Sequence, residues 1–191
     1  MFNGPSSIAK SLSMSLGNIF IESAIQRLIS YKDLAEKTFA QLEEKDFYFQ
    51  PNETSNSIAI IIQHMNGNML SRWTNFLTED GEKTWRDRDG EFEIHSGTRQ
   101  QLIEQWNKGW DCLLQSLRSL TEEDLAKTIF IRKEPLSAID AINRQLAHYP
   151  YHVGQIIYIG KILKDDQWKN LSVEKKKSRE FNERMEKENT K

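Results

Sequence analysis

Apolar residues recur every three or four positions in four separate stretches of the chain. The first stretch, for example, places Ile21, Ile25 and Leu28 on one side of a helix. Such spacing builds a hydrophobic stripe along one helical face, which is typical of a helix packed against a protein core. The pattern therefore predicts four long amphipathic helices, over residues 18–44, 58–76, 102–117 and 139–163.

The segments between these stripes carry helix-start and turn signals. Thr98 followed by Gln101 has the form of a capping box, and Ser137 followed by Asp140 resembles another. Thr, Ile and Phe cluster in the stretch KTIFIRKEP, residues 127–135, which predicts an extended segment or a small hairpin arm.

Together these patterns predict an all-α protein, an up-down four-helix bundle with one long loop between its second and third helices. With 191 residues, of which 38% are hydrophobic, the chain is large enough for one domain with a proper core. We expect a single domain over residues 1–170, followed by a charged C-terminal tail over residues 171–191 that is solvated or partly helical.

Charge and cysteine usage exclude several classes of function. The formal net charge is -2, and Lys and Arg are spread along the chain, so we expect no nucleic-acid partner. No run of about 18 apolar residues is present, which argues against a membrane span. Because the first residues lack the apolar core of a secretory signal and Cys112 has no disulfide partner, we expect a cytoplasmic protein.

Three of the four histidines fall on predicted helices. His148 and His152 are four positions apart, a spacing that puts both rings on one helical face, and His64 lies beside the most apolar stretch of the chain. Helical bundles build metal sites from side chains of facing helices, so the three rings fit one shared ion. Other interpretations stay open: His148 and His152 can face solvent or form hydrogen bonds to neighbouring residues, and His64 can be a core histidine bonded to a backbone carbonyl.

Pro150 lies between the paired histidines and has two interpretations. It lacks an amide hydrogen and its ring crowds the carbonyl of Leu146, so it kinks a helix that runs through it, which would aim the pair at His64. Alternatively, Pro150 marks the start of a helix. Gly154, shortly after it, is expected to allow close approach of a neighbouring helix.

Several polar residues on the same two helices are candidates for supporting the site or contacting a substrate. Glutamines three positions from a histidine suit hydrogen bonds to the rings, although surface glutamines are equally consistent with the pattern. Arginines there suit a substrate carboxylate, although an ion pair with Asp or Glu would serve as well. The candidates are Asn68, Arg72, Arg144, Gln145 and Gln155.

The long loop over residues 79–93 is rich in charge, with acidic residues in excess. Such a run is typical of a solvated segment, but it is also consistent with a lid over the site, held down by Trp85 or Phe92. His95 has no partner at ligand spacing and is expected on the surface. The remaining aromatic and thiol positions are expected in the core: Trp73, Trp106, Trp110 and Cys112.

Two stretches of the chain resemble a known superfamily. They are IIQHMNGNMLSRWTNFLTEDGEKTWRDRDGEFE and AINRQLAHYPYHVGQIIYIGK, and their most specific parts are the H-x-x-x-H-x-G-Q motif and the DGEK-x-W-R-x-R-D-x-E-F-E loop. Over residues 20–180, roughly, the chain is similar to the DinB-like superfamily of four-helix bundles, also called YfiT-like metal-dependent hydrolases. The loop motif is typical of one branch only.

The resemblance implies one divalent metal ion, zinc or nickel, held by His64, His148 and His152. It also implies a small-molecule substrate and a homodimer. Similar proteins include S-transferases that use the low-molecular-weight thiols bacillithiol or mycothiol, so thiol transfer is favoured slightly over hydrolysis. A metal-binding bundle without turnover, with a structural or interaction role, stays open as the alternative.

Overall fold

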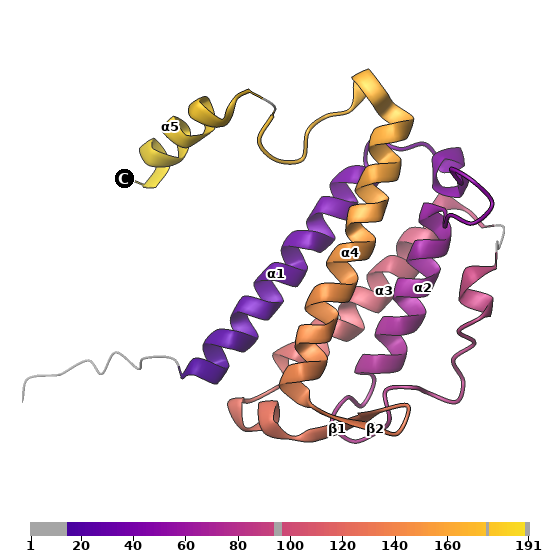
Figure 1. Cartoon of the computed structure of the whole chain (residues 1–191), viewed down its shortest axis with the longest axis vertical. Helices are drawn as coiled ribbons and strands as arrows, with labels where there is room; N and C mark the ends of the chain where they lie inside the picture. The colour runs from indigo at the N-terminus through magenta and orange to yellow at the C-terminus, as the bar shows by residue number, and fades with distance from the viewer. Residues whose placement is uncertain (1–14, 94–96, 175, 190–191) are drawn as a thin grey trace, which may run out of the picture.

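The computed structural model describes residues 15–93, 97–174 and 176–189; His95 and its expected surface position lie outside them. The described chain is mostly helical (Figure 1). Its α-helices are α1 (Leu16–Phe39), α2 (Ile58–Trp73), α3 (Arg99–Arg118), α4 (Ala138–Lys164) and α5 (Ser178–Asn189). Short 3₁₀ helices cover Glu44–Tyr48, Gly90–Phe92, Glu122–Ala126 and Asp165–Gln167, and two strands cover Thr128–Ile131 (β1) and Glu134–Ser137 (β2).

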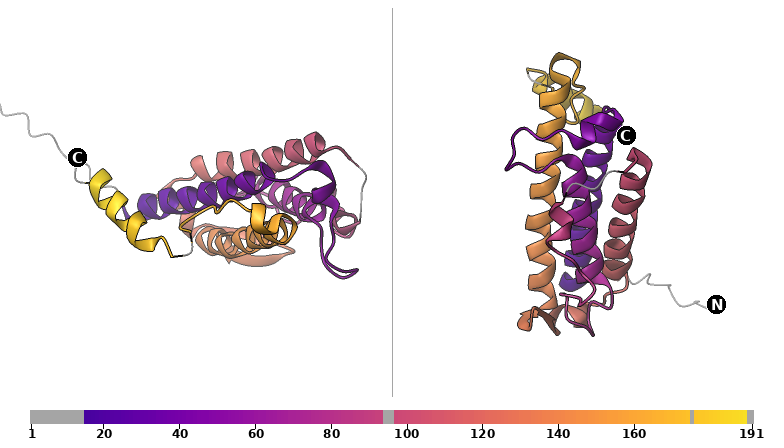
Figure 2. Two further views of the ribbon diagram at one scale, coloured as in Figure 1. Left: turned by 90° about the horizontal axis from the view of Figure 1, so that it is seen from above. Right: turned by 90° about the vertical axis from the view of Figure 1, so that its right-hand side faces the viewer.

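Helices α1 to α4 lie side by side, with α1 packed on α4 and α2 packed on α3 (Figures 1 and 2). The hydrophobic stripes expected from the sequence face inward: Ile21, Ile25 and Leu28 of α1 are all buried. Burial of such side chains contributes about 1.5 to 3 kcal/mol each relative to exposure. Indole rings fill the interior, as predicted, at Trp73, Trp106 and Trp110.

The helix starts that depend on side-chain caps are confirmed. The Thr98 side chain accepts a hydrogen bond from the Gln101 amide, and Gln101 closes the capping box in return. The Ser137 hydroxyl likewise accepts from the Asp140 amide at the start of α4. These local contacts satisfy backbone N–H groups that have no partner inside the helix.

Two predicted helix ends are wrong by a few residues. The first helix ends at Phe39 and not at Glu44, because Asp46 folds back onto the Glu43 amide and starts a separate 3₁₀ turn. The second ends at Trp73 and not at residue 76, because Asn75 has a φ of 51°, which a right-handed helix cannot include. Helix α4 runs through Pro150, so the alternative that Pro150 starts a helix is wrong.

The all-α prediction is wrong in one respect, because β1 and β2 form an antiparallel hairpin. This is the hairpin arm that residues 127–135 indicated. Ile129 and Ile131 point into the core on alternate positions of β1. Arg132 and Lys133 turn the chain with positive φ angles of 57° and 65°, and Asp80 accepts hydrogen bonds from both of their amides.

The C-terminal helix α5 lies beyond the four long helices (Figure 1). Its sequence, SREFNERMEKEN, is dominated by charge, and its described side chains are mostly exposed. None of the helices in the described part of the chain combines the length and the apolar character needed to cross a membrane.

The tight helix approach expected at Gly154 is wrong, because a Cβ there would meet nothing within 4 Å. One close approach between helices is at Gly109 of α3, where a Cβ would lie 3.0 Å from the Asn66 Cα and 3.2 Å from the Met69 Sδ. A glycine is therefore needed at residue 109 and not at residue 154.

These two glycines form a matched pair for a stability test. Gly154→Ala should raise the free energy of unfolding by about 0.5 to 1 kcal/mol, since alanine is the better helix former. Gly109→Ala should lower it by about 1 to 3 kcal/mol, since the new methyl group crowds the backbone of α2. Urea denaturation of both variants checks this, and equal effects would contradict the close packing of α2 on α3.

Candidate metal centre

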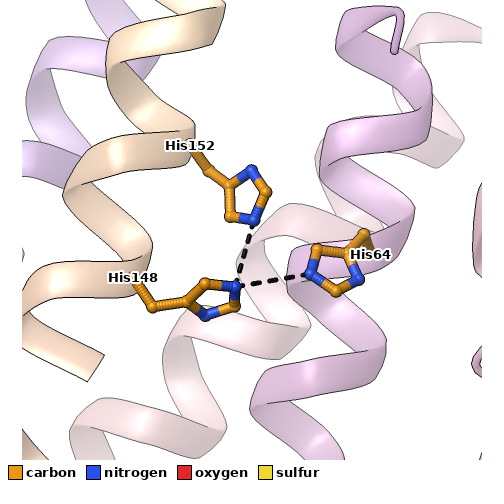
Figure 3. Close-up of side chains that lie close together, drawn as sticks. All are labelled: His64, His148 and His152. Atoms are coloured by element: carbon orange, nitrogen blue, oxygen red, sulfur yellow. Dashed lines mark hydrogen bonds between the residues drawn. The ribbon is translucent and has the colours of Figure 1, made fainter. Parts of the chain in front are cut away.

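Helices α2 and α4 bring the three predicted histidines together (Figure 3). The Nε2 atom of His148 lies 3.5 Å from Nε2 of His64 and 3.1 Å from Nε2 of His152. His64 and His152 are 6% and 4% exposed, whereas His148 is half-buried and forms the open side of the cluster. The three ligand atoms all lie within 4.8 Å of one another.

Each ring directs its other nitrogen, Nδ1, at an oxygen atom. The partners are Glu91 Oε2 for His64 at 3.0 Å, Gln145 Oε1 for His148 at 3.3 Å, and Gln155 Oε1 for His152 at 2.9 Å. A carboxylate or amide oxygen accepts a hydrogen bond, so each ring carries its proton on Nδ1. The three Nε2 atoms are then left with lone pairs that face a common point.

Three lone pairs that face one another, two of them on buried rings and one on a half-buried ring, are unfavourable without a positive charge between them. If the proton of His148 were on Nε2, the ring could donate it to His64 or to His152, but not to both. Burial and the neighbouring rings lower the pKa of His148 to about 3, and burial lowers the pKa of His152 to about 4. His148 and His152 are therefore neutral near pH 7, which suits them as metal ligands.

The two separations from His148 Nε2 to the other rings fit a first-row divalent ion. Bonds of about 2.0 to 2.1 Å in tetrahedral directions put neighbouring ligand atoms roughly 3.3 Å apart. The contacts of 3.5 Å and 3.1 Å from His148 lie on either side of that value. Imidazole nitrogen suits zinc and nickel among others, so the residues present fit the ion that the resemblance implies.

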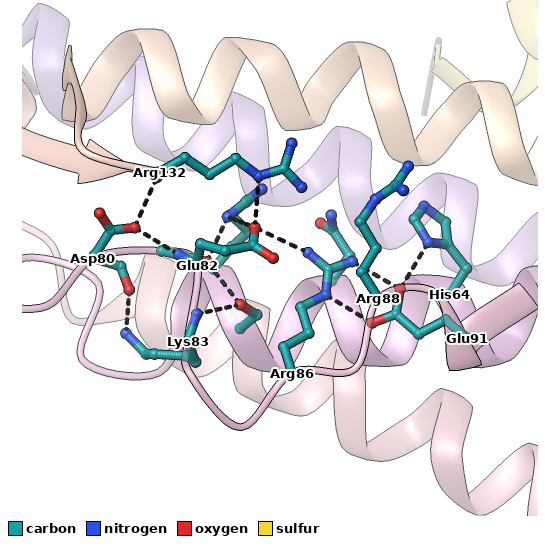
Figure 4. A network of polar contacts seen from close by, with 12 residues as sticks. His64, Asp80, Glu82, Lys83, Arg86, Arg88, Glu91 and Arg132 are labelled. Atoms are coloured by element: carbon teal, nitrogen blue, oxygen red, sulfur yellow. Dashed lines mark hydrogen bonds and ion pairs between the residues drawn. The ribbon is translucent and has the colours of Figure 1, made fainter.

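Glu91 and Arg86 complete the surroundings of His64 (Figure 4). Arg86 donates two hydrogen bonds to the Glu91 carboxylate, of 2.7 Å from Nε and 2.8 Å from Nη2. The Arg86 side chain is only 2% exposed. The interpretation of residues 79–93 as a solvated charge run is therefore wrong at these positions, because their charges are buried in pairs.

The aromatic residues of the loop behave differently from one another. Trp85 is 59% exposed, so its expected insertion into the bundle is wrong. The Phe92 ring lies against the His64 ring, with 4.8 Å between centroids. Outside the loop, the exposed Tyr151 of α4 places its ring against that of His152, with 4.2 Å between centroids. Two aromatic rings thus flank the histidine cluster.

The two candidate arginines have different surroundings. Arg72 is buried and donates from Nη1 to the Gly81 carbonyl and to Glu82, which is the ion pair that the sequence left open as an alternative to a substrate contact. Arg144 is exposed, and the charges of both arginines contribute to the lowered pKa of His148. Of the two, Arg144 is the one that reaches solvent.

Asn68 lies behind the cluster and supports packing. Its Oδ1 accepts a hydrogen bond from the Tyr149 hydroxyl at 3.0 Å, and that hydroxyl accepts from Trp73 Nε1 at 3.1 Å. These contacts join α2 to α4, and burial raises the pKa of Tyr149. Cys112 is half-buried and not fully buried as expected; its Sγ lies 3.6 Å from Thr74 Oγ1.

The sequence interpretation did not single out Glu91, Arg86 or Gly67. The loop charges give no sign of which carboxylate turns inward, because the path of the loop is a tertiary property. A glycine in the middle of a predicted helix can indicate that another segment of the chain packs closely against it. Gly67, three residues after His64, is such a glycine.

Fold and site together define a mostly helical protein with a buried cluster of three histidines. The chain belongs to the DUF1572 family, described as a protein of unknown function, whose model matches residues 15–177. A similar fold occurs in the crystal structure of a conserved protein from Enterococcus faecalis, with a TM-score of 0.59 at 15% identity. That match covers 78% of this chain and 98% of the other. No curated protein matches the sequence.

The lowered pKa values predict how the metal-free protein responds to acid. In the folded chain the pKa values of His148 and His152 are about 3 and about 4, whereas the ordinary value for histidine is 6.5. Below about pH 6.5 the unfolded chain therefore binds more protons than the folded chain. These two rings should therefore leave the free energy of unfolding unchanged above about pH 6.5. From pH 6.5 toward pH 5 they should lower it, by up to about 1.4 kcal/mol per pH unit for each ring.

Urea denaturation in the presence of a chelator measures this slope. A variant with His148→Gln and His152→Gln together is the control, and it should lose most of the dependence between about pH 7 and pH 5.5, a range that lies above the ordinary carboxyl pKa values of about 3.9 and 4.3. An unchanged slope in that variant would contradict the assignment.

Proposed function

We propose that this protein binds one divalent metal ion, zinc or nickel, through His64, His148 and His152. The observation that carries the proposal is the convergence of three buried Nε2 lone pairs, each fixed by an acceptor on Nδ1. Three protein ligands leave coordination positions free, which is the arrangement of catalytic zinc sites and not of closed structural ones.

We further assign α1 to α4 to an up-down four-helix bundle of the DinB-like type, forming one domain with the charged tail outside it. The side-by-side packing of these helices and the position of the site between α2 and α4 support this assignment. The fold shared with the Enterococcus faecalis protein is consistent with it.

The proposed activity is that of a metal-dependent enzyme acting on a small molecule, with low-molecular-weight thiol S-transfer favoured over hydrolysis. When bound, the ion supplies Lewis acidity that lowers the pKa of a water or thiol ligand. The half-buried edge of His148 supports access from solvent, Phe92 and Tyr151 supply apolar walls, and exposed Arg144 suits an anionic group of the ligand.

A metal-binding protein without turnover is the second candidate, and one observation favours it. The carboxylate that lies against the cluster, that of Glu91, faces His64 Nδ1 and is held by Arg86. It is therefore turned away from the point where the Nε2 atoms meet, and it does not serve there as a general base.

The proposed setting is cytoplasmic, with the protein as a homodimer and without a nucleic-acid or membrane partner. Exposed Tyr151, Tyr158 and Ile162 share one face of α4, and such an apolar stripe is consistent with a second copy packed on it.

Metal binding is tested on protein purified without an affinity tag. Elemental analysis should find one zinc or nickel ion per chain, and His64→Ala should lose it. Because the ion binds the folded state, zinc at about 100 times its dissociation constant should stabilise the wild-type chain by about 2.7 kcal/mol. His95→Ala is the matched histidine control and should bind as the wild type does. A wild-type chain that takes up neither zinc nor nickel would refute the proposal.

Catalysis is tested by a conjugation assay with bacillithiol and other low-molecular-weight thiols against a chloro-substituted fluorogenic electrophile. The metal-loaded wild-type protein should accelerate the substitution in which the thiol sulfur bonds to carbon and chloride leaves, and His148→Ala should lower the rate by about 100-fold or more, toward background. Metal binding without acceleration of conjugation or ester hydrolysis would favour the second candidate.

A further inference from the structure

We propose that Glu91 is a positioning residue for the three-histidine site: its carboxylate fixes His64 in the metal-binding tautomer and places one negative charge next to the ion. The proposal rests on the metal-binding function proposed above. The charged loop over residues 79–93 thereby has a role in the site, because Glu91 of this loop lies outside α2 and contacts His64 on it.

Both oxygens of the Glu91 carboxylate are occupied. Oε1 accepts from Arg86 Nε, and Oε2 accepts from Arg86 Nη2 and from His64 Nδ1. Glu91 is 9% exposed and Arg86 is more deeply buried, so the pair is shielded from water. A bidentate ion pair of this kind fixes the position of the Glu91 carboxylate, and the carboxylate in turn fixes the orientation of the His64 ring.

Helix α2 is shaped to receive this carboxylate. A Cβ on Gly67 would lie 2.0 Å from Glu91 Oε1 and 2.7 Å from its Cδ, so any side chain there would expel the carboxylate. Gly67 follows His64 by three residues and therefore lies on the same face of the helix. Because glycine is a poor residue for a helix interior, its presence here is explained by the space that Glu91 needs.

Glu91 differs in charge from the partners of the other two rings. Gln145 and Gln155 offer neutral amide oxygens to His148 and His152. The Arg86 guanidinium donates to both oxygens of the Glu91 carboxylate, and this two-point ion pair holds the carboxylate in its ionised form. A carboxylate acceptor strengthens the bond between a histidine and a metal ion, so Glu91 supports His64 as a ligand more than a neutral amide oxygen would.

The effect of the charge is tested by Glu91→Gln in the full chain. Cobalt(II) and zinc are titrated into metal-free protein, with a competing chelator to reach tight affinities. Glu91→Gln should lower affinity for both ions by about 10- to 100-fold, and it should shift the visible absorption bands of bound cobalt. Glu82→Gln is the matched control: Glu82 lies in the same loop, pairs with Arg72 and approaches Arg86 at 3.6 Å. It should bind both ions within about twofold of wild type.

Gly67→Ala provides a second test that leaves every polar residue in place. It should weaken metal binding to a similar degree, because the new methyl group displaces the carboxylate from His64. Combined with Glu91→Gln, it should cause little further loss, since both changes remove the same contact. If Glu91→Gln fails to fold because Arg86 is left unpaired, Gly67→Ala carries the test alone.

The outcomes separate this proposal from the function it rests on. Wild-type protein that binds one ion, with Gly67→Ala and any folded Glu91→Gln chain binding equally well, overturns the role of Glu91 and leaves metal binding intact. Loss of affinity in Glu82→Gln equal to that in Glu91→Gln also overturns it, because a general loosening of the loop would then explain both. A wild-type chain that binds no metal overturns both proposals.

Discussion

The burial of three imidazole rings between α2 and α4 is the constraint on which the site depends. Nitrogen atoms hidden from water need partners, and here each Nδ1 has an oxygen atom while the Nε2 atoms have only each other. The helices are held at this distance by the surrounding core and by the Tyr149 contacts to α2, so the rings cannot separate without unpacking the interior.

The loop over residues 79–93 links this site to the β1–β2 hairpin through paired charges (Figure 4). Asp80 holds the turn of the hairpin, Glu82 pairs with Arg72 and Arg132, and Glu91 reaches His64. Buried charges are tolerated only in such pairs, because an unpaired one costs several kcal/mol. A segment without a hydrophobic stripe is therefore ordered by electrostatics, and it covers one side of the histidine cluster.

Much of the fold was predictable because it depends on short-range rules. Stripes such as Ile21, Ile25 and Leu28 follow from the period of the helix, and the caps at Thr98 and Ser137 involve residues three positions apart. The hairpin was visible in its β-branched residues. Helix ends were less predictable, since the left-handed conformation of Asn75 depends on the path of the loop that follows it.

The sequence by itself determined that this chain forms long amphipathic helices and that two of its histidines share one helical face, because both properties depend on residues a few positions apart. The tertiary structure alone decided that Glu91 faces His64, that Gly67 makes room for it, and that Arg72 is used within the protein. Those contacts join α2 to a loop with no repeating pattern, and their geometry is fixed only when the helices pack and buried charges find partners.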